Sequence, residues 1–104
     1  MSSTLKKATG QATSTGSTVF TVPTDSRVTL IGLRCSNTDT EAEHWVEAQI
    51  AGSYVTGREV PLPVGSAIDF LIGSKIVAEG GDEITVFSDD DLDIDVYVSF
   101  LEQE

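Results

Sequence analysis

The sequence predicts an all-β fold, an antiparallel β-sandwich of two sheets that is jelly-roll-like. No useful window repeats its apolar residues with the helical period of 3.6, and short segments rich in β-branched residues alternate with turn residues. Seven or eight short strands at this spacing are typical of sandwiches and jelly rolls. The pattern does not give the order of the strands within the sheets.

Residues 1–17 are expected to form an arm outside the sandwich domain, which then spans residues 18–104. Residues 2–18 contain nine Ser or Thr, and Leu5 is their only sizeable apolar side chain. Such a segment cannot bury itself. It is either a frayed, flexible terminus or a docking arm that orders against a neighbour, for example as an added strand.

Eight strands are predicted in the rest of the chain, separated by turn segments rich in Pro, Gly, Asn, Asp and Ser. The strands are near 18–22, 27–36, 44–51, 53–60, 67–72, 75–78, 83–88 and 92–101. The turns are at 23–26, 37–40, 61–65, 73–74, 80–82 and 89–90. The third and fourth strands form a candidate hairpin around Ala51, Gly52 and Ser53. In the last strand, apolar residues from Leu92 onward alternate with polar ones, so one face is buried.

The strand at 27–36 is apolar on both of its faces. One face carries Val28 and Leu30, and the other carries Ile31, Leu33 and Cys35. Such a strand is expected at the centre of a sheet and covered on both sides, the second cover being the arm or a neighbouring subunit. Gly32 indicates either a bulge or the close approach of another backbone.

The composition excludes several classes of partner. The 104 residues carry 6 Lys and Arg against 17 Asp and Glu, a net charge of −11, whereas nucleic-acid binding needs clustered cations. Cys35 is the only cysteine, so no internal disulfide can form. No apolar run has the length of a signal peptide or a membrane span, so we expect a protein made in a cytoplasm, with no membrane partner.

His44 is the only histidine, and Glu41, Glu43 and Glu47 are close to it in the sequence. A histidine and a carboxylate can ligate a metal or transfer protons. However, no second histidine or cysteine lies nearby, and a single histidine does not indicate a Ser-His-Asp arrangement. We therefore expect a structural, partly exposed histidine, and neither an enzyme, a cofactor nor a metal site.

Five aspartates between residues 89 and 95 have a spacing similar to that of a calcium loop. Counted from Asp89, position six is Ile94, where an EF-hand loop needs glycine, and position twelve is Phe100, where it needs glutamate. Alternate residues on one strand face are also about 7 Å apart, too far to enclose one ion. We expect a solvated acidic face instead, formed by Asp91, Asp93 and Asp95, with an adventitious or interfacial cation as the alternative.

Three aromatic residues are candidates for an interface, because each falls out of phase with the apolar face of its strand. They are Trp45, Phe87 and Tyr97. Tryptophan is favoured at interface centres, although burial in the sandwich core is the alternative for these rings. Lys6 and Lys7 complete the candidate interface, because the basic front of the chain can attract its acidic remainder, within one chain or between copies.

Several short motifs follow one another in a characteristic order. They are Val-Phe-Thr-Val-Pro at 19–23, Pro-Leu-Pro-Val-Gly-Ser at 61–66, Gly-Asp-Glu-Ile-Thr-Val at 81–86 and a closing Val-Ser-Phe-Leu-Glu at 98–102. Together they resemble the small β-sandwich virion proteins of tailed bacteriophages. The resemblance covers nearly the whole chain from Val19, and the acidic stretch 89–95 departs from it.

This resemblance implies a non-enzymatic structural component of the virion that is present in many copies. We expect an oligomeric capsid decoration (cement) protein, a homotrimer that binds the shell and bridges coat subunits. A tail or fibre-attachment component is the alternative within this class. In another class, a carbohydrate-binding module would use Trp45, Tyr54 or Tyr97 as a stacking platform.

Overall fold

In the computed structural model, which describes residues 3–71 and 75–103, the chain forms ten strands and no helix. The strands are β1 (Ser3–Gln11), β2 (Ser17–Thr21), β3 (Arg27–Asn37), β4 (His44–Ile50), β5 (Ser53–Tyr54), β6 (Val60–Leu62), β7 (Ala67–Asp69), β8 (Ile76–Glu79), β9 (Glu83–Ser88) and β10 (Ile94–Gln103). The turn predicted at 73–74 lies outside the described residues.

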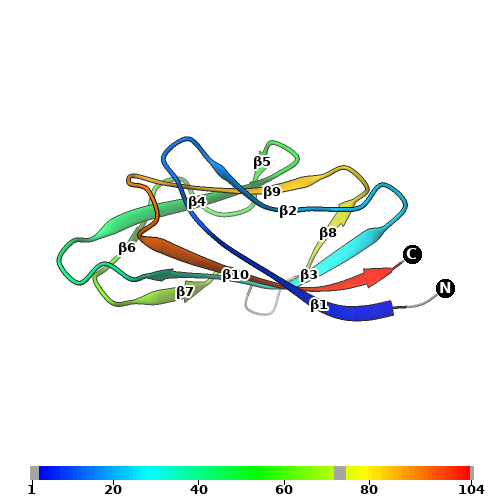
Figure 1. Ribbon diagram of the computed structural model, residues 1–104, viewed down its shortest axis with the longest axis horizontal. Coiled ribbons are helices and arrows are strands. Elements are labelled where there is room, and N and C mark those ends of the chain that lie inside the picture. The colour runs from blue at the N-terminus through cyan, green and yellow to red at the C-terminus, as the bar shows by residue number, and fades with distance from the viewer. Residues whose placement is uncertain (1–2, 72–74, 104) are drawn as a thin grey trace.

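These strands form two antiparallel sheets that are stacked as two layers (Figure 1). Sheet A has the order β1-β10-β3-β7, with β8 also paired to β3. Sheet B has the order β2-β9-β4-β5, with β6 also paired to β4. Strands β1 and β10 pair in sheet A, and β2 and β9, the next strands along the chain from each end, pair in sheet B. This is the strand arrangement of a jelly roll. The predicted all-β sandwich is confirmed.

A bulge in β3 decides which of its side chains enter the core. In the pairing of β3 with β10, Leu30 lies opposite Phe100 and Gly32 lies opposite Ser99, so Ile31 is an extra residue. The extra residue reverses the alternation of faces, and Ile31 is 42% exposed. The fully buried side chains of β3 are Val28, Leu30, Leu33 and Cys35. The expectation of two apolar faces was therefore wrong.

Residues 3–11 form the edge strand β1 of sheet A, whereas the sequence predicted an arm outside the sandwich over 1–17. Strand β1 pairs with β10 along its whole length, from Ser3 opposite Gln103 to Gln11 opposite Asp95. Strand pairing uses backbone hydrogen bonds and does not require apolar side chains, so composition gave no sign of it. Residue 18 therefore does not mark a structural boundary.

The core lies between the two sheets and combines side chains from both. Phe20 of sheet B contacts Phe100 of sheet A, with ring centroids 4.5 Å apart. The largest fully buried side chains are Phe100, Leu30, Leu33, Leu62, Ile84, Ile94, Val22, Val28, Val46, Val86, Val96 and Val98. Burying each contributes roughly 1.5–3 kcal/mol to folding, opposed by the loss of conformational entropy.

The hairpin of β4 and β5 is present as predicted. Ala51 and Gly52 have φ values of 53° and 82°, which fits the two-residue type I′ turn that suits the twist of paired strands. The long strand predicted over 53–60 is instead divided between β5 and β6. The last strand begins at Ile94 rather than at Leu92, whose φ is 68° and whose side chain is exposed.

Candidate functional site

Two loops meet at the end of the sandwich that lies away from the chain termini (Figure 1). The loop 38–43 connects β3 to β4, and the loop 89–93 connects β9 to β10. His44, the first residue of β4, lies between them with a side chain that is only 6% exposed. The expected partial exposure was wrong, because His44 shares the inward face of β4 with Val46.

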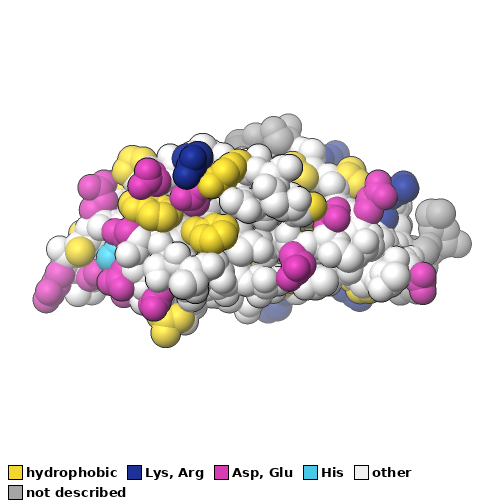
Figure 2. Space-filling model, turned by 90° about the horizontal axis from the view of Figure 1, so that it is seen from above, with side chains coloured by type: hydrophobic (Ala, Val, Ile, Leu, Met, Phe, Trp, Pro, Cys, Tyr) yellow, Lys and Arg dark blue, Asp and Glu magenta, His cyan; other side chains and the backbone are white. Residues whose placement is uncertain are grey.

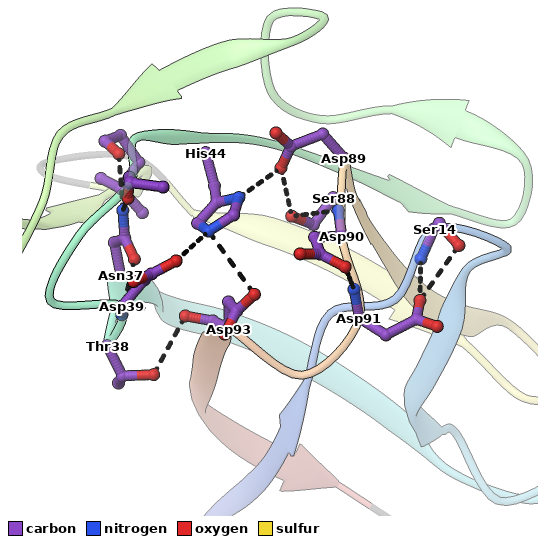
Figure 3. Close-up of polar contacts among 12 residues, drawn as sticks. Ser14, Asn37, Thr38, Asp39, His44, Ser88, Asp89, Asp90, Asp91 and Asp93 are labelled. Carbon is purple, nitrogen blue, oxygen red and sulfur yellow. Dashed lines mark hydrogen bonds and ion pairs between the residues drawn. The ribbon is translucent and has the colours of Figure 1, made fainter.

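Both ring nitrogens of His44 face carboxylates (Figure 3). Nε2 is 2.8 Å from Oδ2 of Asp39 and 3.5 Å from Oδ2 of Asp93. Nδ1 is 2.8 Å from Oδ1 of Asp89. An imidazole with an acceptor at each nitrogen satisfies both contacts only when it is doubly protonated. The ring thus joins the two loops, and its carboxylate contacts favour the imidazolium form.

The loop 38–43 is built around Asn37, which holds Asp39 in place. The Asn37 amide donates to the carbonyl oxygens of Ala42 and Leu62, at 3.1 and 2.9 Å. Its side-chain oxygen accepts from the Asp39 amide at 2.9 Å, and the Asp39 carboxylate accepts from the Glu41 amide at 2.8 Å. These are successive Asx turns, in which a side chain replaces a backbone partner two residues away.

Asp91 and Asp95 are exposed, as predicted, but Asp91, Asp93 and Asp95 do not share one strand face, and each has a separate partner. Asp91 accepts hydrogen bonds from the amide and the hydroxyl of Ser14, at 2.8 and 3.0 Å. Asp93 faces His44, and Asp95 accepts from Gln11 Nε2 at 3.0 Å. The difference arises because β10 begins only at Ile94, so Asp91 and Asp93 belong to a loop.

The electrostatics of this end are those of a cation surrounded by excess negative charge. The pKa of His44 is raised by its hydrogen bond to Asp39 and further by Asp89, although burial opposes this. The pKa of Asp39 is lowered by the Glu41 amide and then by His44. The pKa of Asp93 is raised by burial and by the nearby Asp90 and Asp39 carboxylates, which outweigh His44. One imidazolium does not balance these carboxylates.

This arrangement can bind a cation, but it does not have the geometry of nucleophilic catalysis. Asp39, His44 and Asp93 each offer one ligand atom, and the three atoms lie within 4.8 Å of one another. The nearby Ser88 hydroxyl donates to Asp89 at 3.1 Å. A catalytic serine instead requires its hydroxyl to contact the base.

A second feature of interest is the outer face of sheet A, where a row of side chains crosses four strands. Leu5 of β1 lies opposite Leu101, Leu101 lies opposite Thr29, and Thr29 lies opposite Val77 of β8. Leu5 is 68% and Val77 is 55% exposed. Ile31, displaced outward by the bulge, adds to this row. We call these five residues the sheet A band.

Of the predicted interface residues, Tyr97 and Lys7 lie beside the sheet A band on the same face. Lys7 Nζ is 5.9 Å from the centre of the Tyr97 ring, and two shallow depressions flank this ring. Lys6 points to the other side of β1, where Nζ forms an ion pair with Glu102 at 2.9 Å. The two adjacent lysines therefore face opposite sides of the sheet.

Trp45 and Phe87 lie on the outer face of sheet B, so the five predicted interface residues do not form one surface. Both rings are half-buried. Phe87 covers Gly16, where an added Cβ would lie 2.5 Å from the ring. Trp45 lines a shallow depression with Glu43, Glu59 and Asp89 among its other residues. Figure 2 shows this side of the molecule, with acidic side chains gathered at the end that holds the histidine.

Comparison with protein-family models, with curated proteins and with solved structures finds no significant match to this chain. None of the described residues belongs to a helix long and apolar enough to span a membrane.

Sequence reasoning missed Asp39 and Asp89 as the partners of His44, since it considered only the nearby glutamates. Asp39 is five residues away and Asp89 is forty-five residues away. The Asn37-Thr38-Asp39 sequence was read as a turn, and its Asx character was the available sign that Asp39 is held in a fixed position. The position of Asp89 depends on the pairing of β4 with β9, which the sequence did not give.

Proposed function

We propose that this protein is a non-enzymatic structural protein of the virion of a tailed bacteriophage. It acts as a capsid decoration protein that binds the coat protein with the outer face of sheet A. The proposal is supported by the order of motifs from Val19 and by the jelly-roll arrangement, which also occurs in viral capsid domains. Because one fold can serve many functions, the main support for this function comes from the outer surface of sheet A.

The observation that carries the proposal is the sheet A band. Exposed apolar side chains that form one continuous group are typical of protein interfaces, whereas single ones are common on any surface. Leu5, Ile31 and Val77 are exposed on the outer face of sheet A, and Tyr97 lies beside them. Many copies, each burying such a modest patch, would stabilise a shell additively.

Carbohydrate binding has less support from the geometry. A stacking platform needs an open aromatic face, but Lys7 lies over the Tyr97 ring and Arg58 lies over the Tyr54 ring, at 5.9 and 5.1 Å. Trp45 is half-buried. Binding of isolated protein to glycans, with loss on Tyr97→Ala, would favour that function instead.

The test is to quantify this chain in purified particles of a phage that encodes it and to measure rebinding to particles that lack it. We expect a copy number comparable to that of the coat protein, and rebinding that is lost in the double variant Ile31→Lys, Val77→Lys. Tyr54→Lys, at a tyrosine of similar exposure on sheet B, is the matched control and should rebind normally. Tens of copies per particle would indicate the tail instead, and absence from particles would refute the proposal.

The proposed homotrimer would bury part of the same face between copies. Sedimentation equilibrium at micromolar concentration should then give about 33 kDa, three times the 11.1 kDa of one chain. The double variant should lower this mass to that of the monomer. If the parent chain and the double variant are both monomers, the trimer is refuted. The outer face of sheet A would then bind only the shell.

A further inference from the structure

We propose that Asp39, His44 and Asp93 bind one divalent transition-metal ion, for which Zn²⁺ is the best match. One imidazole nitrogen and two carboxylate oxygens are a donor set that zinc accepts, and zinc binds such ligands more tightly than most other divalent ions. The site goes beyond the proposed structural role and does not depend on it.

The ligand atoms already have nearly the spacing that zinc requires. Ligands bound about 2.1 Å from one zinc ion at the tetrahedral angle lie about 3.4 Å apart. Nε2 of His44 is 2.8 Å from the Asp39 oxygen and 3.5 Å from the Asp93 oxygen, and all three atoms lie within 4.8 Å of one another. Small side-chain movements would therefore bring them around one ion.

A buried, oriented imidazole distinguishes this site from an ordinary group of surface carboxylates. His44 is 6% exposed, and its Nδ1 is 2.8 Å from Oδ1 of Asp89 (Figure 3). Histidines that ligate zinc commonly donate their other ring N–H to a carboxylate, which fixes the tautomer and aims the free lone pair at the metal. Asp89 is then a positioning residue that directs Nε2 toward Asp39 and Asp93.

Charge also favours a divalent ion over the single proton that the ring can hold at Nε2. The Asp39 and Asp93 carboxylates both face Nε2 of His44, so two negative groups share this one position. Binding forms bonds from Nε2 and two carboxylate oxygens to the ion and releases the Nε2 proton to solvent, while Nδ1 keeps its proton. The Asp39 and Asp93 side chains are 23% and 32% exposed, so the ion can reach them.

The first test is a titration of the full chain with ZnCl₂, followed by calorimetry and by ¹⁵N NMR of the imidazole. The single histidine gives one pair of ring nitrogen signals, and their different couplings to the carbon-bound ring protons distinguish Nδ1 from Nε2. We expect one ion per chain with micromolar affinity, a large change in the Nε2 signal and a protonated Nδ1. Mg²⁺ and Ca²⁺ should leave both signals unchanged, because they prefer oxygen ligands.

Matched variants separate the site from general attraction to an acidic surface. Asp93→Asn should weaken zinc binding at least tenfold, and Asp89→Asn should weaken it about 10- to 100-fold. Asp95→Asn removes the same charge two residues away, where the partner is Gln11, and should bind like the parent chain. Circular dichroism checks that each variant is folded.

Three outcomes would overturn the proposal. They are no saturable binding of Zn²⁺ to the parent chain at millimolar concentration, an equal loss of affinity in Asp93→Asn and Asp95→Asn, and a zinc-dependent change at Nδ1 in place of Nε2. The NMR measurement on the parent chain shows whether zinc binds through Nε2 of His44, even where a variant does not fold.

Discussion

The extra residue at Ile31 shows how one position can redirect a strand. Before it, Val28 and Leu30 face the core, and after it Leu33 and Cys35 do so as well. Without the bulge, strict alternation would have placed these two pairs on opposite faces. Gly32, the neighbouring residue, lies close to Ser99, since an added Cβ would be 3.5 Å from the serine Oγ.

We predict that substitutions at Ile31 and Leu33 differ strongly in their effect on the free energy of unfolding. Leu33→Ala should lower it by about 2–5 kcal/mol, because it leaves a cavity in the core. Ile31→Ala should lower it by less than about 1 kcal/mol, because the side chain is partly in solvent. Urea denaturation measures both, and a larger effect at Ile31 would show that Ile31, not Leu33, faces the core.

Cys35 should be chemically inert in the folded protein. The thiol is fully buried, and burial, together with the nearby Asp69, raises its pKa to about 12. Since the thiolate is the reactive form, Ellman's reagent at pH 8 should label Cys35 only as fast as the chain unfolds. Rapid labelling of folded protein would contradict the buried position.

The raised pKa of Cys35 also predicts a loss of stability at alkaline pH. The folded pKa lies above the unfolded value of about 8.5, so the contribution is complete below that value and is lost as the pH rises toward 12. Urea midpoints measured between pH 8 and pH 11 should fall less steeply for Cys35→Ala than for the parent chain. Equal slopes would assign the alkaline loss to other groups.

At the scale of elements, β1 shows that a strand with few apolar side chains can be held mainly by its backbone pairing. Its residues are mostly Ser, Thr, Lys and Gly, yet it pairs with β10 along its whole length. Ala8 packs against the core, and Gly10 lets Val19 approach, since an added Cβ would lie 3.5 Å from the valine.

We predict that deleting residues 1–11 lowers the melting temperature by roughly 8 °C or more. The deletion removes a full strand pairing and exposes the edge of β10, and 1 kcal/mol corresponds to about 4–8 °C in a domain of this size. The matched control Leu5→Ser removes an exposed side chain and keeps the backbone, so its melting temperature should stay close to that of the parent chain. An unchanged melting temperature after the deletion would restore the arm interpretation.

Local signals predicted most elements of the fold, whereas contacts distant in sequence escaped prediction. Alternation and turn residues located β2, β3, β9 and the hairpin at Ala51 and Gly52, because these features are encoded by neighbouring residues. The pairing of β1 with β10 and the approach of Asp89 to His44 depend on the order of strands in the sheets. The sequence placed the start of β10 at Leu92, two residues before its actual start at Ile94. Leu92 fits the apolar alternation of the strand, but its backbone, with a φ of 68°, still belongs to the preceding turn.

At the scale of the whole molecule, charge works against the compact state. The chain carries a net charge of −11, and seven acidic residues lie in the loops 38–43 and 89–93 around His44. These residues are Asp39, Glu41, Glu43, Asp89, Asp90, Asp91 and Asp93. Mutual repulsion among such charges destabilises folding.

We predict that raising NaCl from 10 to 150 mM increases the melting temperature by a few degrees. The screening length falls from about 30 Å to about 8 Å over this range, which weakens repulsion across the acidic end more than the close His44 contacts. The double variant Glu43→Gln, Asp90→Asn should show a smaller increase in a salt titration followed by differential scanning fluorimetry. A decrease in the parent chain would mean that attractive pairs dominate.

The pairing of β1 with β10 also has a consequence for the time at which the protein can fold. On the ribosome, β1 is made well before its partner β10, because the other described strands of both sheets lie between them in the sequence. One edge of the central strand β3 also stays unpaired until β10 is made, since β10 lies between β1 and β3 in sheet A. Contacts between such distant segments form slowly, and unpaired strand edges are prone to aggregation until they close. Sheet A is therefore assembled late, and newly made chains at high local concentration depend on their acidic charge to stay apart during that interval.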